Sequence, residues 1–124
     1  MKSILFVDQD RDVCALAGEA GETLSDCHLE VYPTLARAEA AAGVSDPAVA
    51  VVDGMFGEKE LLFFLERMHG RFPDLPIVVL VPEVDLIVEP GFIEDLKRRG
   101  ARVMAKTEVF GTGEKLLDFF QSFR

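Results

Sequence analysis

The sequence has no tryptophan, one tyrosine, two cysteines and two histidines. Cys14 and Cys27 form no Cys-x-x-Cys pair, and His28 and His69 lie far apart in the sequence. Zinc sites in proteins need clustered cysteine and histidine ligands. The sequence therefore indicates two buried free thiols in a reducing compartment and no zinc site.

Long apolar runs and clustered cations are also missing. The longest apolar stretches, such as 76–81, are far too short to span a bilayer. The apolar start of the chain leads directly into Asp8, Asp10 and Asp12, which is not typical of a signal peptide, so we expect a cytoplasmic protein. A net charge of −9 repels phosphates, so we expect neither nucleic acid nor a membrane surface as a partner.

What is present indicates a globular protein. The chain has 124 residues, of which 49% are hydrophobic and 28% are charged. This length is typical of one domain, and this composition argues against disorder. We therefore expect a single domain that spans residues 1–124.

Five short apolar runs alternate with five helical patterns. Strands are predicted at 2–7, 28–31, 48–52, 76–81 and 101–105. Helices are predicted after a cap at Asp10, at 34–43, 58–69 and 91–99, and after a cap at Thr112. This alternation predicts an α/β fold, a doubly wound sandwich whose parallel sheet is covered by helices on both faces. In such a fold functional groups gather outside the carboxyl ends of the strands.

Charged residues stand at three of the predicted strand ends. Asp8 ends the first strand, Asp53 ends the third and Lys106 ends the fifth. Two carboxylates in one crevice repel each other, which favours a bound cation or an ammonium group between them. A carboxylate can also attack a phosphoryl group when a metal ion neutralises the charge. We expect a salt bridge between Lys106 and Asp53.

These residues, with the runs 4–8, 51–53, 76–80 and 100–101, resemble a response-regulator receiver domain over essentially the whole chain. The resemblance implies a three-layer (βα)5 sandwich, flavodoxin-like and CheY-like, with a five-stranded parallel sheet in order 2-1-3-4-5. It implies that Asp53 is the phosphoacceptor and that Lys106 holds the family's lysine position. It also implies an acidic pocket at Asp8, Gln9 and Asp10, and Mg²⁺ held by Asp8, Asp53 and the backbone carbonyl of Met55.

Several positions depart from the family's pattern. Gln9 stands where a second acidic residue would bind Mg²⁺, and a neutral amide is a weaker ligand for that hard cation. Val81 stands at the Ser/Thr-switch position and cannot donate a hydrogen bond to a phosphoryl group. Val103 replaces the aromatic switch, Gly57 stands at a usual proline position, and Thr107 replaces the proline after the lysine. The pattern resembles a degenerate receiver, or pseudo-receiver.

The resemblance therefore implies a receiver-like domain of two-component signalling, acting as a protein-interaction module in a phosphorelay with impaired or atypical aspartyl phosphorylation. Its partner would be a histidine kinase or another signalling protein. A conventional receiver phosphorylated on Asp53 is the alternative, and a flavin- or nucleotide-binding protein of the same architecture is a remote one. No nucleophile elbow, P-loop or metal-ligand histidine pair is visible, so we expect no enzyme beyond self-phosphorylation and dephosphorylation of Asp53.

The sequence leaves two alternatives for the role of each of two segments. The phenylalanines of the last helix, Phe119, Phe120 and Phe123, are either core residues or part of a partner surface, for example a homodimer through the last helices and strand. The apolar loop 83–89 is either a contact region or a helical turn packed on the sheet.

Overall fold

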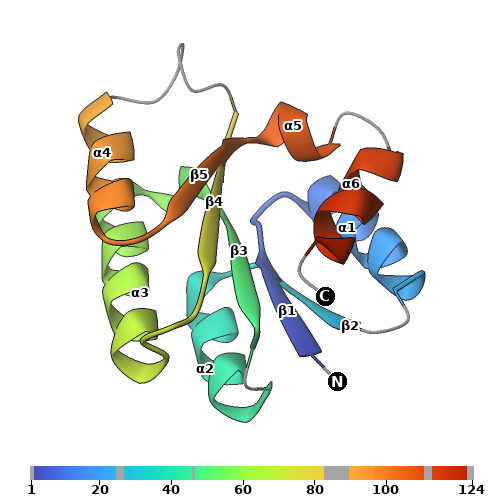
Figure 1. Cartoon of the computed structure of the whole chain (residues 1–124), viewed down its shortest axis with the longest axis horizontal. Helices are drawn as coiled ribbons and strands as arrows, with labels where there is room; N and C mark the ends of the chain where they lie inside the picture. Colours follow the sequence, from blue (N-terminus) through green and yellow to red (C-terminus); the bar gives the residue numbers. More distant parts are fainter. Residues whose placement is uncertain (1, 25–26, 46, 83–89, 111–112, 123–124) are drawn as a thin grey trace.

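A five-stranded parallel sheet forms the middle layer of the molecule (Figure 1). The computed structural model describes residues 2–24, 27–45, 47–82, 90–110 and 113–122. The strands lie in the order β2-β1-β3-β4-β5, as predicted for a flavodoxin-like sandwich. Their bounds are β1 (Lys2–Val7), β2 (Cys27–Tyr32), β3 (Val49–Asp53), β4 (Ile77–Val81) and β5 (Arg102–Ala105).

Helices cover both faces of the sheet. One layer holds α2 (Leu35–Ser45), α3 (Glu58–Arg71) and α4 (Pro90–Arg98), and the other holds α1 (Arg11–Glu22), α5 (Lys106–Phe110) and α6 (Gly113–Gln121) (Figure 1). A short 3-10 turn, η1 (Gly54–Phe56), follows β3. No helix within the described ranges is both long and apolar enough to cross a membrane.

The continuous apolar runs of the sequence are explained by burial on two faces. Alternate side chains of β1 enter different cores: Leu5 and Val7 pack toward α2, α3 and α4, whereas Ile4 and Phe6 pack toward the other layer. The ring of Phe120 meets that of Phe6 edge to face, with 5.8 Å between centroids. Phe120 is therefore a core residue, while Phe119 beside it is half-buried.

Several predicted boundaries were wrong. Gly43 was predicted to end the second helix, but α2 continues to Ser45. A Cβ on Gly43 would lie 2.5 Å from Arg71 Nη2, so the glycine leaves room for a guanidinium that donates a hydrogen bond to the Glu39 carbonyl (2.9 Å). The segment between β3 and α3 contains η1, and α5 begins directly at Lys106.

Some predictions fall where the structure gives no description. The cap at Thr112, the side chain of Phe123 and the loop 83–89 lie outside the described residues. Both cysteines are free thiols as predicted, but only Cys27 is buried, whereas Cys14 is half-buried.

Candidate functional site

The strand register brings three charged residues to one edge of the sheet. Val7 of β1 pairs with Val52 of β3, so the next residues, Asp8 and Asp53, lie side by side. Val81 of β4 pairs with Ala105 of β5, so Lys106 follows at the same edge. All the strands are parallel, and this edge holds their carboxyl ends.

Lys106 joins the two carboxylates. Its Nζ lies 3.1 Å from Asp8 Oδ2 and 3.1 Å from Asp53 Oδ1. Asp8 is 1% exposed and Asp53 is 3% exposed, whereas the Lys106 side chain keeps 21% of its surface. The structure thus confirms the predicted salt bridge between Lys106 and Asp53. We call Asp8, Asp53 and Lys106 the charge triad.

The triad shifts the pKa of two of its members. Burial raises the pKa of the Asp8 carboxyl, because a desolvated carboxylate is less stable than the neutral acid, and the charge of Asp53 adds to this. The N–H of Asp10, which donates to Asp8 Oδ1 (2.9 Å), acts in the opposite direction. Burial alone would lower the pKa of Lys106, but the negative charge of Asp53 and hydrogen bonds to both carboxylates raise it.

Met55, in η1, is held at both of its backbone polar groups. Its N–H donates to Asp53 Oδ1 (3.1 Å), so this carboxylate oxygen also caps the 3-10 turn. Its carbonyl accepts a hydrogen bond from Gln9 Nε2 (3.2 Å). The resemblance implied the Met55 carbonyl as a metal ligand and Gln9 as the neutral replacement of another, and the structure places the two in contact.

Asp10 does not join the acidic pocket that the sequence assigned to it. Its side chain is exposed and caps α1, where Oδ1 accepts hydrogen bonds from the N–H groups of Asp12 (2.9 Å) and Val13 (3.4 Å). The predicted helix cap is therefore confirmed. In the structure this carboxylate caps the helix, and the ion pairs of Lys106 go to Asp8 and Asp53 instead.

The two switch positions carry apolar side chains in the structure. Val81 is fully buried at the end of β4, and Val103 is half-buried and packs against the core on the α3 and α4 side. Gly57, at the usual proline position, has a φ of 111°. Proline is locked near −65°, so this turn excludes the family's residue and favours glycine.

Cys14 also touches this edge, which the sequence did not indicate. Its Sγ donates to the backbone carbonyl of Asp8 (3.0 Å). Burial raises the pKa of this thiol, and the charges of Asp8 and Asp10 raise it further. The spacing of six residues between Cys14 and Asp8, across a loop and the first turn of α1, was the available signal.

The donor set does not fit Mg²⁺ as it is arranged. Mg²⁺ prefers six oxygen ligands, usually including carboxylates. Asp8 Oδ2 faces the ammonium of Lys106, Asp53 Oδ1 is shared between Lys106 and Met55, and the Met55 carbonyl is bonded to Gln9. Among the residues that the structure describes, no three Asp, Glu, His or Cys side chains form a cluster able to hold a metal ion.

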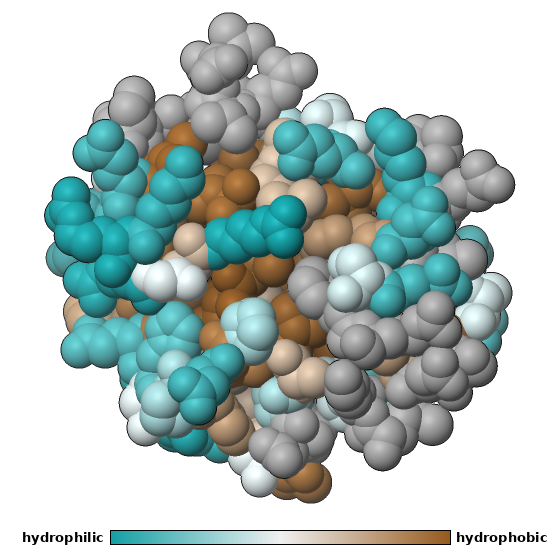
Figure 2. Space-filling view, viewed as in Figure 1, coloured by the Kyte–Doolittle hydropathy of each residue, from teal (hydrophilic) through white to brown (hydrophobic). Residues whose placement is uncertain are grey.

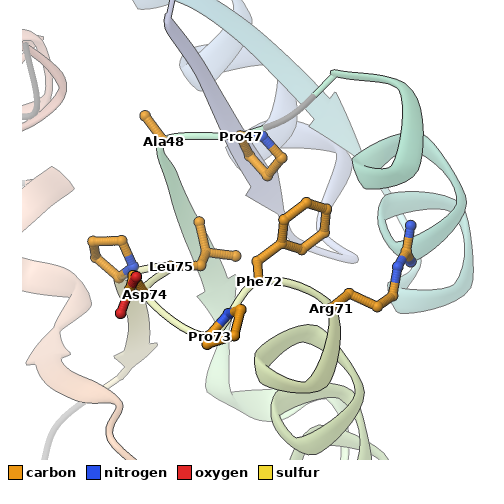
Figure 3. A pocket seen from close by; sticks show the side chains of 8 residues that line it. Pro47, Ala48, Arg71, Phe72, Pro73, Asp74 and Leu75 are labelled. Carbon is orange, nitrogen blue, oxygen red and sulfur yellow. The ribbon is translucent and has the colours of Figure 1, made fainter.

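A hollow lies at the opposite edge of the sheet, before β3 and β4 (Figure 3). It has a volume of about 330 Å³, and Phe72, Leu75 and three prolines line it together with Arg71 and Asp74. The guanidinium of Arg71 lies over the ring of Phe72, 5.3 Å from its centroid. This hollow contains none of the residues singled out from the sequence, so the triad remains the candidate site.

Comparison with known proteins identifies the type of fold. No family model and no curated protein matches the sequence. Solved structures resemble it at a low level of sequence identity, and three examples follow. The chemotaxis protein CheY4 of Vibrio cholerae is 20% identical with a TM-score of 0.77, over 100% of this chain and 99% of that one.

The other two structures are described as response regulators. A CheY-like receiver domain protein from Methanospirillum hungatei is 18% identical with a TM-score of 0.78, over 98% of this chain and 92% of that one. A response regulator from Thermotoga maritima is 19% identical with a TM-score of 0.76, over 99% and 97%. The chain therefore has the CheY-like fold of receiver domains.

Proposed function

We propose that this chain is a receiver-like domain of two-component signalling that works as a protein-interaction module in a phosphorelay, with impaired phosphorylation of Asp53. The observation that carries the proposal is the charge triad at the carboxyl ends of the strands. Lys106 Nζ stands 3.1 Å from both Asp8 and Asp53, on a fold shared with receiver domains. This arrangement keeps a potential nucleophile and a cation in contact.

The surroundings of Asp53 support impairment. For phosphotransfer, a carboxylate oxygen of Asp53 attacks the phosphorus of a donor, the new acyl phosphate bond forms, and the donor's oxygen leaves. Oδ1 is already occupied by Lys106 and by the Met55 N–H. Val81 supplies no hydrogen-bond donor for the phosphoryl oxygens, and Gln9 adds no charge for Mg²⁺ binding, which we propose is weakened.

Incubation with acetyl phosphate and MgCl₂, read by intact mass, tests this proposal. Acetate is the leaving group, so each modified chain gains one phosphoryl group. We expect little or no adduct on the wild-type chain, and none on Asp53→Ala. A stoichiometric adduct on the wild-type chain that Asp53→Ala abolishes would overturn the impairment.

A conventional receiver is the second candidate, and the triad itself favours it. All three groups that accept and neutralise a phosphoryl group by the resemblance are present and in contact. In that case a histidine kinase would transfer a phosphoryl group to Asp53. The only chemistry we assign in either case is self-phosphorylation and dephosphorylation of Asp53.

A protein partner is part of the proposal. It would be a histidine kinase or another signalling protein, and a second copy of the chain could bind through the last helices and strand. Hydrophobic surface remains visible over the strands at the centre of the face in Figure 2. The edge strand β5 contributes half-buried Val103 and Met104. Sedimentation over a range of protein concentrations tests the homodimer, and a monomer at every concentration would exclude it.

A further inference from the structure

Two side chains occupy the places where a metal ion would need free oxygen ligands. The Lys106 ammonium stands between Asp8 Oδ2 and Asp53 Oδ1 at 3.1 Å from each. The Gln9 amide donates to the Met55 carbonyl at 3.2 Å. We propose that Lys106 and Gln9 together take the place of a divalent cation in this pocket, and that Gln9→Asp alone converts the pocket into a Mg²⁺ site. This inference rests on the proposed function because it concerns the same pocket.

The charge balance favours this assignment. Two carboxylates against one ammonium leave the pocket with one net negative charge, so a divalent cation would leave it positive. A third carboxylate at position 9 would change the net charge of the pocket from −1 to −2, which one Mg²⁺ neutralises. The existing pocket therefore attracts a divalent cation with one net negative charge only, whereas the aspartate variant attracts it with two.

The hydrogen bonds lead to the same conclusion. Gln9 Nε2 is a donor, and it uses the Met55 carbonyl that the metal would need. A carboxylate has no donor, so Gln9→Asp frees this carbonyl and adds oxygen ligands in one step. Asp8 Oδ2 is buried and has no hydrogen bond beyond its ion pair with Lys106, so this ion pair is the one contact that a metal ion has to displace at that oxygen.

The position of Gln9 makes the exchange feasible. Its side chain is exposed, so the substitution opens no cavity and is compatible with folding. Without metal, the added charge stands beside Asp8, and like charges close together lower stability. The variant should therefore be less stable than the wild type in EDTA and should regain stability with Mg²⁺.

The test compares the complete wild-type chain with Gln9→Asp and a matched control, Gln121→Asp, which makes the same exchange at the end of α6. Thermal unfolding is measured in EDTA, in MgCl₂, and in NaCl of equal ionic strength, and Mg²⁺ binding is measured by calorimetry. We expect the Tm of Gln9→Asp to rise with MgCl₂ alone and its Kd to be at least ~10-fold lower than that of the wild type. The wild type and Gln121→Asp should show no difference between the two salts.

Equal Mg²⁺ affinity in the wild type and Gln9→Asp would overturn the inference, as would a Gln9→Asp variant with no Mg²⁺ response. Gln9→Glu, which keeps the length of the native side chain, is the second variant should Gln9→Asp not fold. The two proposals fail separately. A phosphorylated wild type that ignores Mg²⁺ contradicts the proposed impairment alone. A wild type that binds Mg²⁺ as tightly as Gln9→Asp but is not phosphorylated contradicts this inference and leaves the impaired phosphorylation of Asp53 standing.

Discussion

Gln9 Nε2 lies 3.2 Å from the backbone carbonyl of Met55, a residue 46 positions away in the sequence. This bond ties the loop after β1 to the turn after β3. Together with the ammonium of Lys106, it gives the carboxyl edge of the sheet a closed set of protein contacts. The predictions below test how much this edge and its surroundings contribute to stability and reactivity.

Removal of the triad's cation should destabilise the fold. Lys106→Met leaves two nearly buried carboxylates without a counter-charge, and breaking a buried ion pair is strongly unfavourable. Because the lysine is partly exposed, we expect the free energy of unfolding to fall by roughly 2–4 kcal/mol. Urea unfolding followed by circular dichroism measures this loss.

Lys97→Met provides the control, since Lys97 is an exposed residue of α4 with the same side chain. Its substitution should change stability by less than about 0.5 kcal/mol. Asp53→Asn in the Lys106→Met background should restore part of the loss, because it removes one of the two repelling charges. Equal effects at Lys106 and Lys97 would mean that the ion pairs do not stabilise the fold.

The only tyrosine of the chain should titrate late. Burial, a hydrogen bond to Glu30 Oε1 (2.7 Å) and the charge of Glu30 raise the pKa of Tyr32 to about 12. The neutral phenol is thus favoured in the folded state. Its stabilising contribution is complete below an unfolded-state pKa of about 10 and is lost as the pH rises toward 12.

Phenolate absorbance measures this titration directly, because no tryptophan or second tyrosine contributes. We expect a midpoint clearly above that of free tyrosine. Glu30→Gln keeps a hydrogen-bond acceptor but removes the charge, so the midpoint should fall. A wild-type midpoint near 10 would show that Glu30 and burial do not act on Tyr32.

Two glycines should respond oppositely to alanine. A Cβ on Gly54 would lie 2.9 Å from Val81 Cγ1 and 3.0 Å from the Leu80 carbonyl oxygen, so Gly54→Ala forces η1 away from β4. We expect a loss of about 1–3 kcal/mol in unfolding free energy. Gly18, inside α1, has open space where a Cβ would stand, with nothing within 4 Å, and Gly18→Ala should gain about 0.5–1 kcal/mol. Thermal unfolding that ranks the two variants the other way would contradict this packing.

The thiol of Cys14 should react slowly in the folded protein. Its raised pKa keeps it protonated, and the thiolate is the reactive form. In a Cys27→Ser background, reaction with an aromatic disulfide at pH 8 should be several-fold slower in the folded chain than in urea. Asp10→Asn should speed the folded-state reaction, since it removes one of the charges that raise this pKa. Equal rates in buffer and urea would contradict the hydrogen bond to Asp8.

The sequence predicted the strands well because burial on two faces leaves a clear signal. The apolar run at 48–52 and Asp53 after it fixed β3 and its last residue almost to the position. Helix ends were harder, because they depend on contacts with other elements. Gly43 looks like a helix stop, yet Arg71 from α3 packs against it and α2 continues.

The sequence could predict those site residues that are brought together by their place at the carboxyl ends of the strands. Asp53 ends β3, and Asp8 and Lys106 directly follow β1 and β5, so parallel pairing alone brings the three together. The partner of Gln9 was not predictable, because its side-chain amide reaches Met55 only once two loops are folded. For Asp10 the sequence suggested a place in the acidic pocket. Its local role as the cap of α1 decides instead where its carboxylate lies.

The Lys106 ammonium itself offers the most direct measurement. In nitrogen-15 spectra of the wild-type chain, an ammonium held by two carboxylates should give a protected side-chain signal at low temperature. We expect this signal to persist in excess MgCl₂ and to disappear in Asp53→Asn/Asp8→Asn. Loss of the signal from the wild type on addition of MgCl₂, but not of NaCl at equal ionic strength, would show that a metal ion displaces the lysine and would contradict the account.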